Sequence, residues 1–348
     1  MHWINEPTKT PDVKIEAAAR EHQNQLTKPA GSLGRLEELA IQFAALQGVL
    51  KPELNNVHII VFAGDHGVTE ENISAYPQAV TAQMVENIAN GGAAISVLAK
   101  EIGAKLKVVD VAVNGPASVS ANVTIKRLVN GTANFAKAEA LSKDNTVKAL
   151  DVGRERILKS CKDGMQLFIG GEMGIGNTTS ASTLAASLLE MNVEQLTGPG
   201  TGLEQSAINH KSLVIQQALY DHRKAAVTSL DKLRCFAGAE IVALVGAYVT
   251  CAQHGVPILI DGFISSVAAL YARSLNKGVC DWLLFSHQSK EPGHKHVLKA
   301  LKATPIIDLG MRLGEGSGAA VAYSLIKNAI ALHNNMATFS EAGVSEKD

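Results

Sequence analysis

Short apolar runs alternate with helical periodicity along most of the chain. The runs of strand length are residues 57–63, 106–113, 166–169, 256–260, 282–285 and 305–307. Helical spacing of apolar residues lies between them, in residues 78–90, 146–161, 178–189, 204–220, 231–254, 265–275 and 316–334. Strands that are apolar almost throughout are typical of parallel sheets, which are buried on both faces. The alternation therefore predicts a doubly wound, mainly parallel α/β sheet flanked by helices.

The two ends of the chain fall outside this alternation. The first ~50 residues are helical in pattern and precede the first strand. We expect them to form a small helical domain together with the C-terminal helix. The predicted division is residues 1–50 for the N-terminal part of the small domain, 51–318 for the catalytic α/β domain, and 319–348 for the C-terminal helix and tail.

Composition narrows the class of protein. Of the 348 residues, 46% are apolar, 19% are charged and only 4% are aromatic, and the net charge is −1. A large core is therefore possible, whereas a basic or aromatic surface for nucleic acid is not expected. No apolar stretch is long enough to span a membrane, and the N-terminus has no signal-peptide pattern. The four cysteines form no CxxC pair, which is typical of reduced thiols in a cytoplasmic protein.

Glycine-rich loops follow four of the predicted strands. They include residues 64–67, 170–176, 261–263 and 309–318. In doubly wound sheets, ligands bind beyond the carboxyl ends of the strands, where such loops gather. We therefore expect one site built from all four loops.

The loop Gly171-x4-Gly176-Asn177-Thr178 resembles a phosphate-binding loop, with Asn at the lysine position. Backbone N–H groups near Gly174 and Gly176, at the start of a helix, favour a phosphate. The missing lysine makes a monophosphate a better ligand than a triphosphate. The alternative is a tight turn into a helix that Thr178 or Thr179 caps.

A second glycine-rich stretch, residues 198–202, offers Gly200 and Gly202 as further anion-binding positions. Lys211, on the helix that follows, is a candidate counter-charge. An ordinary loop with a solvated lysine is equally compatible with this pattern.

Glu172 and Glu315 are the candidate acid–base residues. Each stands among glycines, and Glu315 lies between Gly314 and Gly316 at the predicted start of a helix. A carboxylate at a helix N-terminus is stabilised by the helix dipole, which lowers its proton affinity. A general base needs a partly desolvated pocket to offset that effect. Both the structural and the catalytic interpretation stay open for each residue.

Three further polar features have simpler alternatives. Asp65-His66 lacks a third ligand for a metal, so we expect no metal site there. Asp261, directly after a strand, is either a helix cap or an acceptor for a ligand hydroxyl. Residues 286–294 form a polar loop that is either the rim of the site or plain surface.

Six segments together resemble the nicotinate-nucleotide–dimethylbenzimidazole phosphoribosyltransferases, the CobT family. They are residues 28–37, 62–68, 171–181, 198–203, 261–265 and 309–319. The resemblance covers residues 5–338 and implies a Rossmann-like fold with a small second domain, and a homodimer. It implies no cofactor and no metal.

The resemblance also implies a reaction. Phosphoribosyl passes from nicotinate mononucleotide to 5,6-dimethylbenzimidazole with inversion at C1′, giving α-ribazole 5′-phosphate and nicotinate. Glu315 corresponds to the family's general base, and Glu172 lines the same pocket. The segment with Tyr76 and Gln83 is expected to border the base. Two alternatives are a nucleotide-binding regulatory protein without catalysis, and a phosphoribosyltransferase for another base or donor.

Overall fold

The computed structural model describes residues 2–200 and 202–345. Within these residues, six strands form one sheet: β1 Val57–Gly64, β2 Lys105–Ala112, β3 Val123–Ile125, β4 Leu167–Met173, β5 Ile258–Ile260 and β6 Leu283–Phe285. Their order is β3-β2-β1-β4-β5-β6, and every neighbouring pair is parallel. The first strand thus lies in the middle of the sheet, and later strands are added on both of its sides, which confirms the doubly wound fold.

The strand order reverses between β1 and β4. Their register pairs Val61 with Gly171 and Phe62 with Glu172, so the carboxyl ends of both strands lie at the same height. The segments that follow them turn in opposite directions, which leaves a crevice at this point of a doubly wound sheet. The loops predicted from the sequence leave the sheet at this edge.

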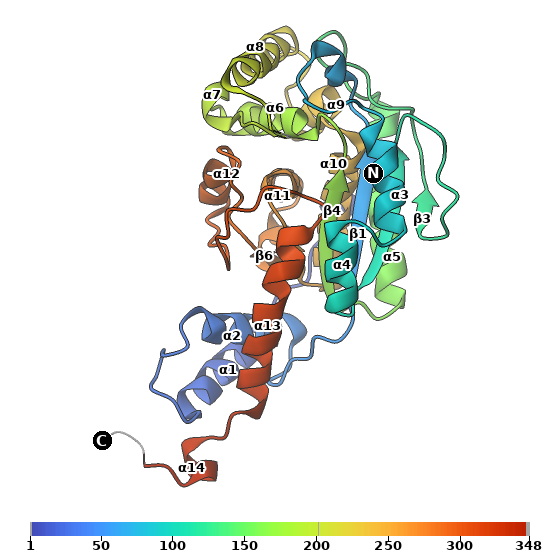
Figure 1. Ribbon diagram of the computed structural model, residues 1–348. Coiled ribbons are helices and arrows are strands. Elements are labelled where there is room, and N and C mark those ends of the chain that lie inside the picture. Colours follow the sequence, from blue (N-terminus) through green and yellow to red (C-terminus); the bar gives the residue numbers. More distant parts are fainter. Residues whose placement is uncertain (1, 201, 346–348) are drawn as a thin grey trace.

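Helices cover both faces of the sheet (Figure 1). The longer ones are α1 Val13–Gln25, α2 Arg35–Gln47, α3 Val80–Ala89, α4 Ala94–Glu101, α5 Lys143–Lys162, α6 Asn177–Leu189, α8 Gln205–Asp221, α9 Ser229–Phe236, α10 Ala239–His254, α11 Phe263–Leu275, α12 His294–Leu301 and α13 Ser317–Asn335. Short turns are η1 His2–Asn5, η2 Gly67–Glu71, α7 Val193–Leu196, η3 Lys277–Trp282 and α14 Phe339–Ala342. In the described part of the chain, none of these helices has the length and apolar character to cross a bilayer.

The central helix α10 packs against β1, β2 and β4, with α5 on its outer side. Its residues from Ala239 to Ala252 are all buried, which fits a sequence that is apolar on every side. On the other face, α3 and α4 pack on the β1–β2 side and α13 packs on β4 and β5 (Figure 1).

The N-terminal helices lie apart from the sheet. α1 packs on α2, and α2 packs on α13, so that the three helices form a group at the lower end of Figure 1. α13 is one continuous helix that begins at the edge of the sheet and ends beside α1 and α2. The two-domain division stays a prediction, and its boundary at residues 318–319 falls in the first turn of α13.

Several predicted elements differ from the structure. The helix expected over residues 231–254 is two helices, α9 and α10, separated at Gly238, which has an extended backbone (φ −70°, ψ 153°). A Cβ at Gly238 would overlap His66 and Glu240. Residues 305–307 make a single bridge, from Ile307 to His287, instead of a strand. β3 and α4 are too short to leave a periodic pattern and were not predicted.

Candidate active site

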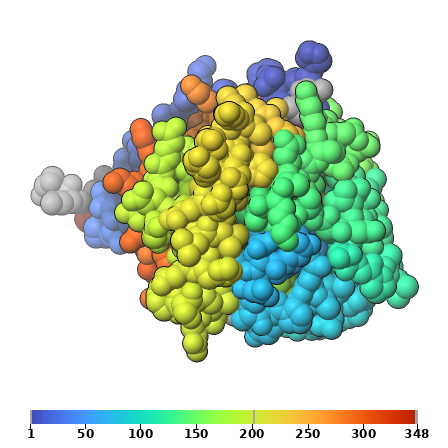
Figure 2. Space-filling model, turned by 90° about the horizontal axis from the view of Figure 1, so that it is seen from above, coloured from blue at the N-terminus to red at the C-terminus, as the bar shows by residue number. Residues whose placement is uncertain are grey.

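A cavity of about 650 Å³ lies beyond the carboxyl ends of the strands. Segments that follow β4, β5 and β6 line it, together with the start of α3 and the loop before α13. The sequence-predicted residues that it brings together are Tyr76, Glu172, Gly174, Asn177, Thr178, Gly200, Asp261, Gly314 and Glu315. The view from above in Figure 2 shows the segments that cover this end of the molecule, with residues 70–90 in blue beside the yellow residues near 220.

Glu172 is the next-to-last residue of β4, and its side chain is buried. Its carboxylate accepts hydrogen bonds from the Asn177 side-chain amide and from the backbone N–H of Glu315. Burial raises the pKa of Glu172 well above its usual range, and the nearby carboxylates of Asp261 and Glu240 add to the shift.

Glu315 sits in the loop that starts α13. Gly314, Glu315 and Gly316 all have positive φ (91°, 64° and 89°), an unusual backbone for the glutamate in the middle. Its carboxylate is buried and accepts a hydrogen bond of 3.4 Å from the N–H of Ile95, in the first turn of α4. Burial raises the pKa of Glu315, and the Ile95 N–H opposes the shift. The desolvated pocket that a general base requires is therefore present.

The two glutamates meet because Gly171 has no side chain. A Cβ at Gly171 would lie well inside 3.0 Å of the carbonyl oxygen of Glu315. A Cβ at Gly314 would likewise overlap the carboxylate of Glu172. The glycines of both motifs thus allow β4 and the loop before α13 to touch, which brings residues 143 positions apart in the chain to one wall of the cavity.

Asp261 caps α13. Its carboxylate accepts from the N–H groups of Gly316 (3.2 Å) and Ala319 (2.9 Å). His287 lies on its other side, with 3.6 Å between His287 Nε2 and Asp261 Oδ1. Both side chains line the cavity. Asp261 therefore does not cap α11, the helix that follows it and whose N-cap is Gly262; it bonds the start of the distant helix α13 and lies at the cavity wall.

The start of α6 forms the part of the cavity wall next to Glu172. Gly176, not a threonine, is its N-cap, with a left-handed backbone (φ 96°). Asn177 and Thr178, in the first turn, line the cavity. The Thr178 hydroxyl accepts a hydrogen bond of 2.9 Å from Lys211 Nζ. A helix N-terminus beside a buried ammonium favours an anion here.

Lys211 is buried in α8, so the solvated alternative is wrong. Burial lowers the pKa of Lys211 to about 8, which the carboxylate of Glu291 opposes. Glu291 is itself buried and accepts a hydrogen bond of 3.1 Å from the N–H of Gly200. The guanidinium of Arg312 donates to the Gly200 carbonyl at 3.0 Å. Two cationic side chains, Lys211 and Arg312, thus lie at this end of the cavity together with the carboxyl group of Glu291.

Five predicted residues are not part of the cavity wall. One is Lys211, which contacts the wall residue Thr178; the other four are Gly176, Gly316, Gly202 and Gln83. Gly176 faces His66, Thr69 and Ile73 behind it, and Gly316 donates its N–H to Asp261. Gly202 is exposed, and its neighbour Thr201 falls outside the described residues. Gln83 lines a separate surface hollow beside Val113 and Pro116, on another side of α3.

Apolar side chains form the remaining wall. Val80 and Met84 lie one turn apart on α3, Phe263 begins α11, and Leu313 precedes the Glu315 loop. Tyr76, at 54% exposure, stands at the mouth. A flat aromatic ligand fits a wall of this kind.

Sequence reasoning left several lining residues unassigned. Arg312 lies within the glycine-rich segment 309–318, but the residues around it in the sequence do not indicate that its side chain bonds Gly200. His287, Ser289 and Glu291 come from the polar loop at residues 286–294, which the cavity shows to be part of its wall. The large number of polar residues in that loop was the available signal.

Comparison with known proteins identifies the family. The profile of a family described as phosphoribosyltransferase matches residues 8–344. A nicotinate-nucleotide–dimethylbenzimidazole phosphoribosyltransferase of Pseudomonas aeruginosa is 52% identical over 347 residues, which is 100% of this chain and 99% of that protein. The chain belongs to the CobT family. One of its members from Pseudomonas putida is 53% identical over 345 residues, or 99% of this chain and 98% of that protein.

Solved structures agree with this assignment. The crystal structure of CobT from Thermus thermophilus matches with a TM-score of 0.92 and 40% identity, over 96% of this chain and 100% of that one. The CobT family resemblance that six short segments suggested thus extends over the whole fold. The chain is accordingly a phosphoribosyltransferase of cobalamin lower-ligand synthesis.

Proposed function

We propose that this enzyme transfers phosphoribosyl from nicotinate mononucleotide to 5,6-dimethylbenzimidazole, with inversion at C1′. The products are α-ribazole 5′-phosphate and nicotinate. The relatives' names supply both substrate classes. The observation that carries the proposal is the convergence of Glu172 and Glu315 on one cavity whose other end has an anion seat.

The nucleotide phosphate is assigned to the start of α6. There the Thr178 side chain lines the cavity, and Lys211 Nζ lies 2.9 Å from its hydroxyl. Arg312, which also lines the cavity, is a second nearby cation. The phosphate fixes the ribose so that C1′ points toward the acidic wall.

The acidic wall suits the charges of the reaction. In nicotinate mononucleotide the bond from C1′ runs to a cationic pyridinium nitrogen, and cleavage returns the bonding electrons to that nitrogen. Positive charge then develops on C1′ and the ring oxygen of the ribose. Carboxylates at Asp261 and Glu315 stabilise that charge in a site that excludes most water.

Glu315 is the general base. The unprotonated nitrogen of dimethylbenzimidazole attacks C1′ as the pyridinium leaves, and its other nitrogen then carries a proton made acidic by the new bond. The carboxylate of Glu315 takes that proton, and its raised pKa makes it a better acceptor. Because attack comes from the face opposite to the leaving group, the configuration at C1′ inverts. The wall of Val80, Met84 and Leu313 holds the aromatic nucleophile in line.

The test is turnover of nicotinate mononucleotide with dimethylbenzimidazole, followed by mass detection of the new nucleotide. Glu315→Gln should lower kcat by roughly 10²–10⁴ while nicotinate mononucleotide still binds. A near-normal rate in that variant refutes the role of Glu315. Binding without turnover in the unmodified protein would instead favour a regulatory protein. The homodimer implied by the family resemblance is tested in the same preparation by light scattering.

A further inference from the structure

A buried polar pair lies behind the cavity and takes no part in the steps above. His66 follows β1, and Glu240 stands in the first turn of α10. His66 Nε2 donates to Glu240 Oε1 at 2.7 Å, and both side chains are almost fully buried, at 1% and 0%. Among the described residues, Glu240 Oε2 has no hydrogen-bond partner. Burying a carboxylate is costly, so His66 is its main compensation.

The pair lies where three segments join. The turn after β4 packs on the ring of His66: a Cβ at Gly174 would be 3.3 Å from both Cδ2 and Nε2. The backbone of His66 is held in turn, because its carbonyl accepts from the Thr69 hydroxyl at 2.8 Å and from Gln78 Nε2 at 3.2 Å. The ring therefore forms a fixed support under the turn that leads into α6.

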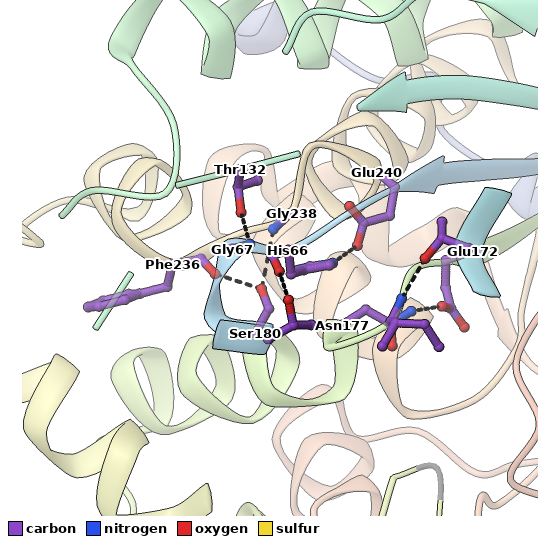
Figure 3. A network of polar contacts seen from close by, with 12 residues as sticks. His66, Gly67, Thr132, Glu172, Asn177, Ser180, Phe236, Gly238 and Glu240 are labelled. Carbon is purple, nitrogen blue, oxygen red and sulfur yellow. Dashed lines mark hydrogen bonds and ion pairs between the residues drawn. The ribbon is translucent and has the colours of Figure 1, made fainter. Parts of the chain in front are cut away.

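The other side of the pair is tied to α6 as well. Gly238, just before α10, lies against both His66 and Glu240. Its N–H donates to the Ser180 hydroxyl at 3.2 Å, and that hydroxyl donates to the Phe236 carbonyl at 2.6 Å. Figure 3 shows the bond between His66 and Glu240 and, beside it, the bonds of Ser180 with Gly238 and Phe236, with Asn177 and Glu172 nearby. The first turn of α6 is thus held from below at two points.

We propose that His66 and Glu240 are positioning residues for the phosphate end of the cavity. Their hydrogen bond fixes the turn at residues 174–176, and with it the first turn of α6. Neither residue lines the cavity, so both act through the backbone of that turn. This inference rests on the proposed function for the identity of the ligand, nicotinate mononucleotide.

The test compares two neutral substitutions that differ in reach. In His66→Gln the side-chain amide can reach Glu240, as Nε2 does, whereas His66→Asn is too short. Calorimetry should find the Kd of nicotinate mononucleotide raised roughly tenfold or more in His66→Asn and mostly restored in His66→Gln. KM should follow the Kd, while kcat at saturation stays within roughly threefold, because Glu315 is unaffected. Glu240→Leu, which removes the acceptor, should raise the Kd as His66→Asn does.

His58→Asn is the matched control. His58 is a buried histidine on β1, the strand that precedes His66, but at the opposite end from the cavity, where it bonds Asn56. It should lose thermal stability without a change in Kd. Equal Kd values for His66→Asn, His66→Gln and the unmodified protein overturn the inference, as does an equal loss in both His66 variants. Failure of the unmodified protein to bind nicotinate mononucleotide would count against the proposed function instead.

Discussion

Gly171→Ala tests whether the contact between the two glutamate loops matters for catalysis. The substitution removes no functional group. It adds one methyl group where β4 touches the carbonyl of Glu315. Relief of the overlap to an ordinary contact of 3.4 Å requires the two backbones to separate by about 1 Å. Gly171 directly precedes Glu172, and the backbone that its new methyl group would meet belongs to Glu315. The shift therefore moves the carboxylates of both glutamates away from their present positions.

The expected cost has two parts. Overpacking of a core position costs about 1–3 kcal/mol of the free energy of unfolding. A misplacement of about 1 Å at a reacting group lowers the rate by roughly 10²-fold. We therefore expect a lower Tm and a kcat reduced roughly 10²-fold. The Kd for nicotinate mononucleotide should rise by less, because the substitution reaches α6 only through the bond between Glu172 and Asn177.

The assay combines thermal unfolding, calorimetry and steady-state kinetics below the Tm of the variant. Gly115→Ala is the control, because a Cβ there meets only Ala82 Cβ, at 3.5 Å, and its φ is not positive. It should match the unmodified protein in all three measurements. A folded Gly171→Ala protein with normal kcat would show that the close contact of the loops does not set the geometry of catalysis.

Four further outcomes follow from the site. With a pKa of about 8, the ammonium of Lys211 loses its proton as the pH rises through 8. Nucleotide binding should therefore weaken between about pH 7 and 9, and Lys211→Met should remove that pH dependence. Because the pKa of Glu315 is raised, kcat should begin to fall at a higher pH than it would with an exposed carboxylate as the base. In Glu315→Gln this fall of kcat on the acidic side should be absent. Gly176→Val should raise the nucleotide Kd, since its φ of 96° strains a side chain, and an unchanged Kd would contradict the seat at α6. Turnover should survive EDTA, because a pyridinium leaving group needs no metal to balance its charge; loss of activity that Mg²⁺ restores would favour a pyrophosphate donor.

The sequence predicted the fold and the meeting of the loops because both follow from local patterns. Apolar runs marked β1, β2 and β4 within one or two residues of their starts. Glycine-rich segments after strands gather at one edge of a parallel sheet, which predicts that Glu172 and Glu315 share a site. For Glu315 the premise is only partly correct, because residues 305–307 make a single bridge beside the sheet and no strand. Neither inference needed knowledge of how side chains pack.

Long-range pairings were beyond the sequence. Nothing near Lys211 indicates that it is buried against Thr178, and nothing near Glu291 indicates that it bonds Gly200, because those partners lie 33 and 91 residues away. α9 and α10 separate at Gly238, where His66 leaves no space for a side chain. For Gln83 the sequence predicts a place beside the base. The residue lies on α3, whose start lines the cavity, but the orientation of the helix directs its side chain to another surface.

The way helix starts are occupied supports the proposal that the phosphate binds at α6. Three of the helices that begin at or near the cavity are α4, α6 and α13. The N–H groups of α13 are taken by Asp261, and the Ile95 N–H of α4 is taken by Glu315. Of these three helices, α6 is the one that, in the described part of the chain, begins without a side-chain cap and has a lysine at its first turn. The N–H groups of Asn177, Thr179 and Ser180 donate to backbone carbonyls instead. Two helix dipoles therefore stabilise the protein's own carboxylates, and in the proposed function the dipole of α6 acts on the phosphate of the substrate. In that proposal, carboxylates on one wall and the cations Lys211 and Arg312 at the other end orient a ligand that is cationic at its base and anionic at its phosphate.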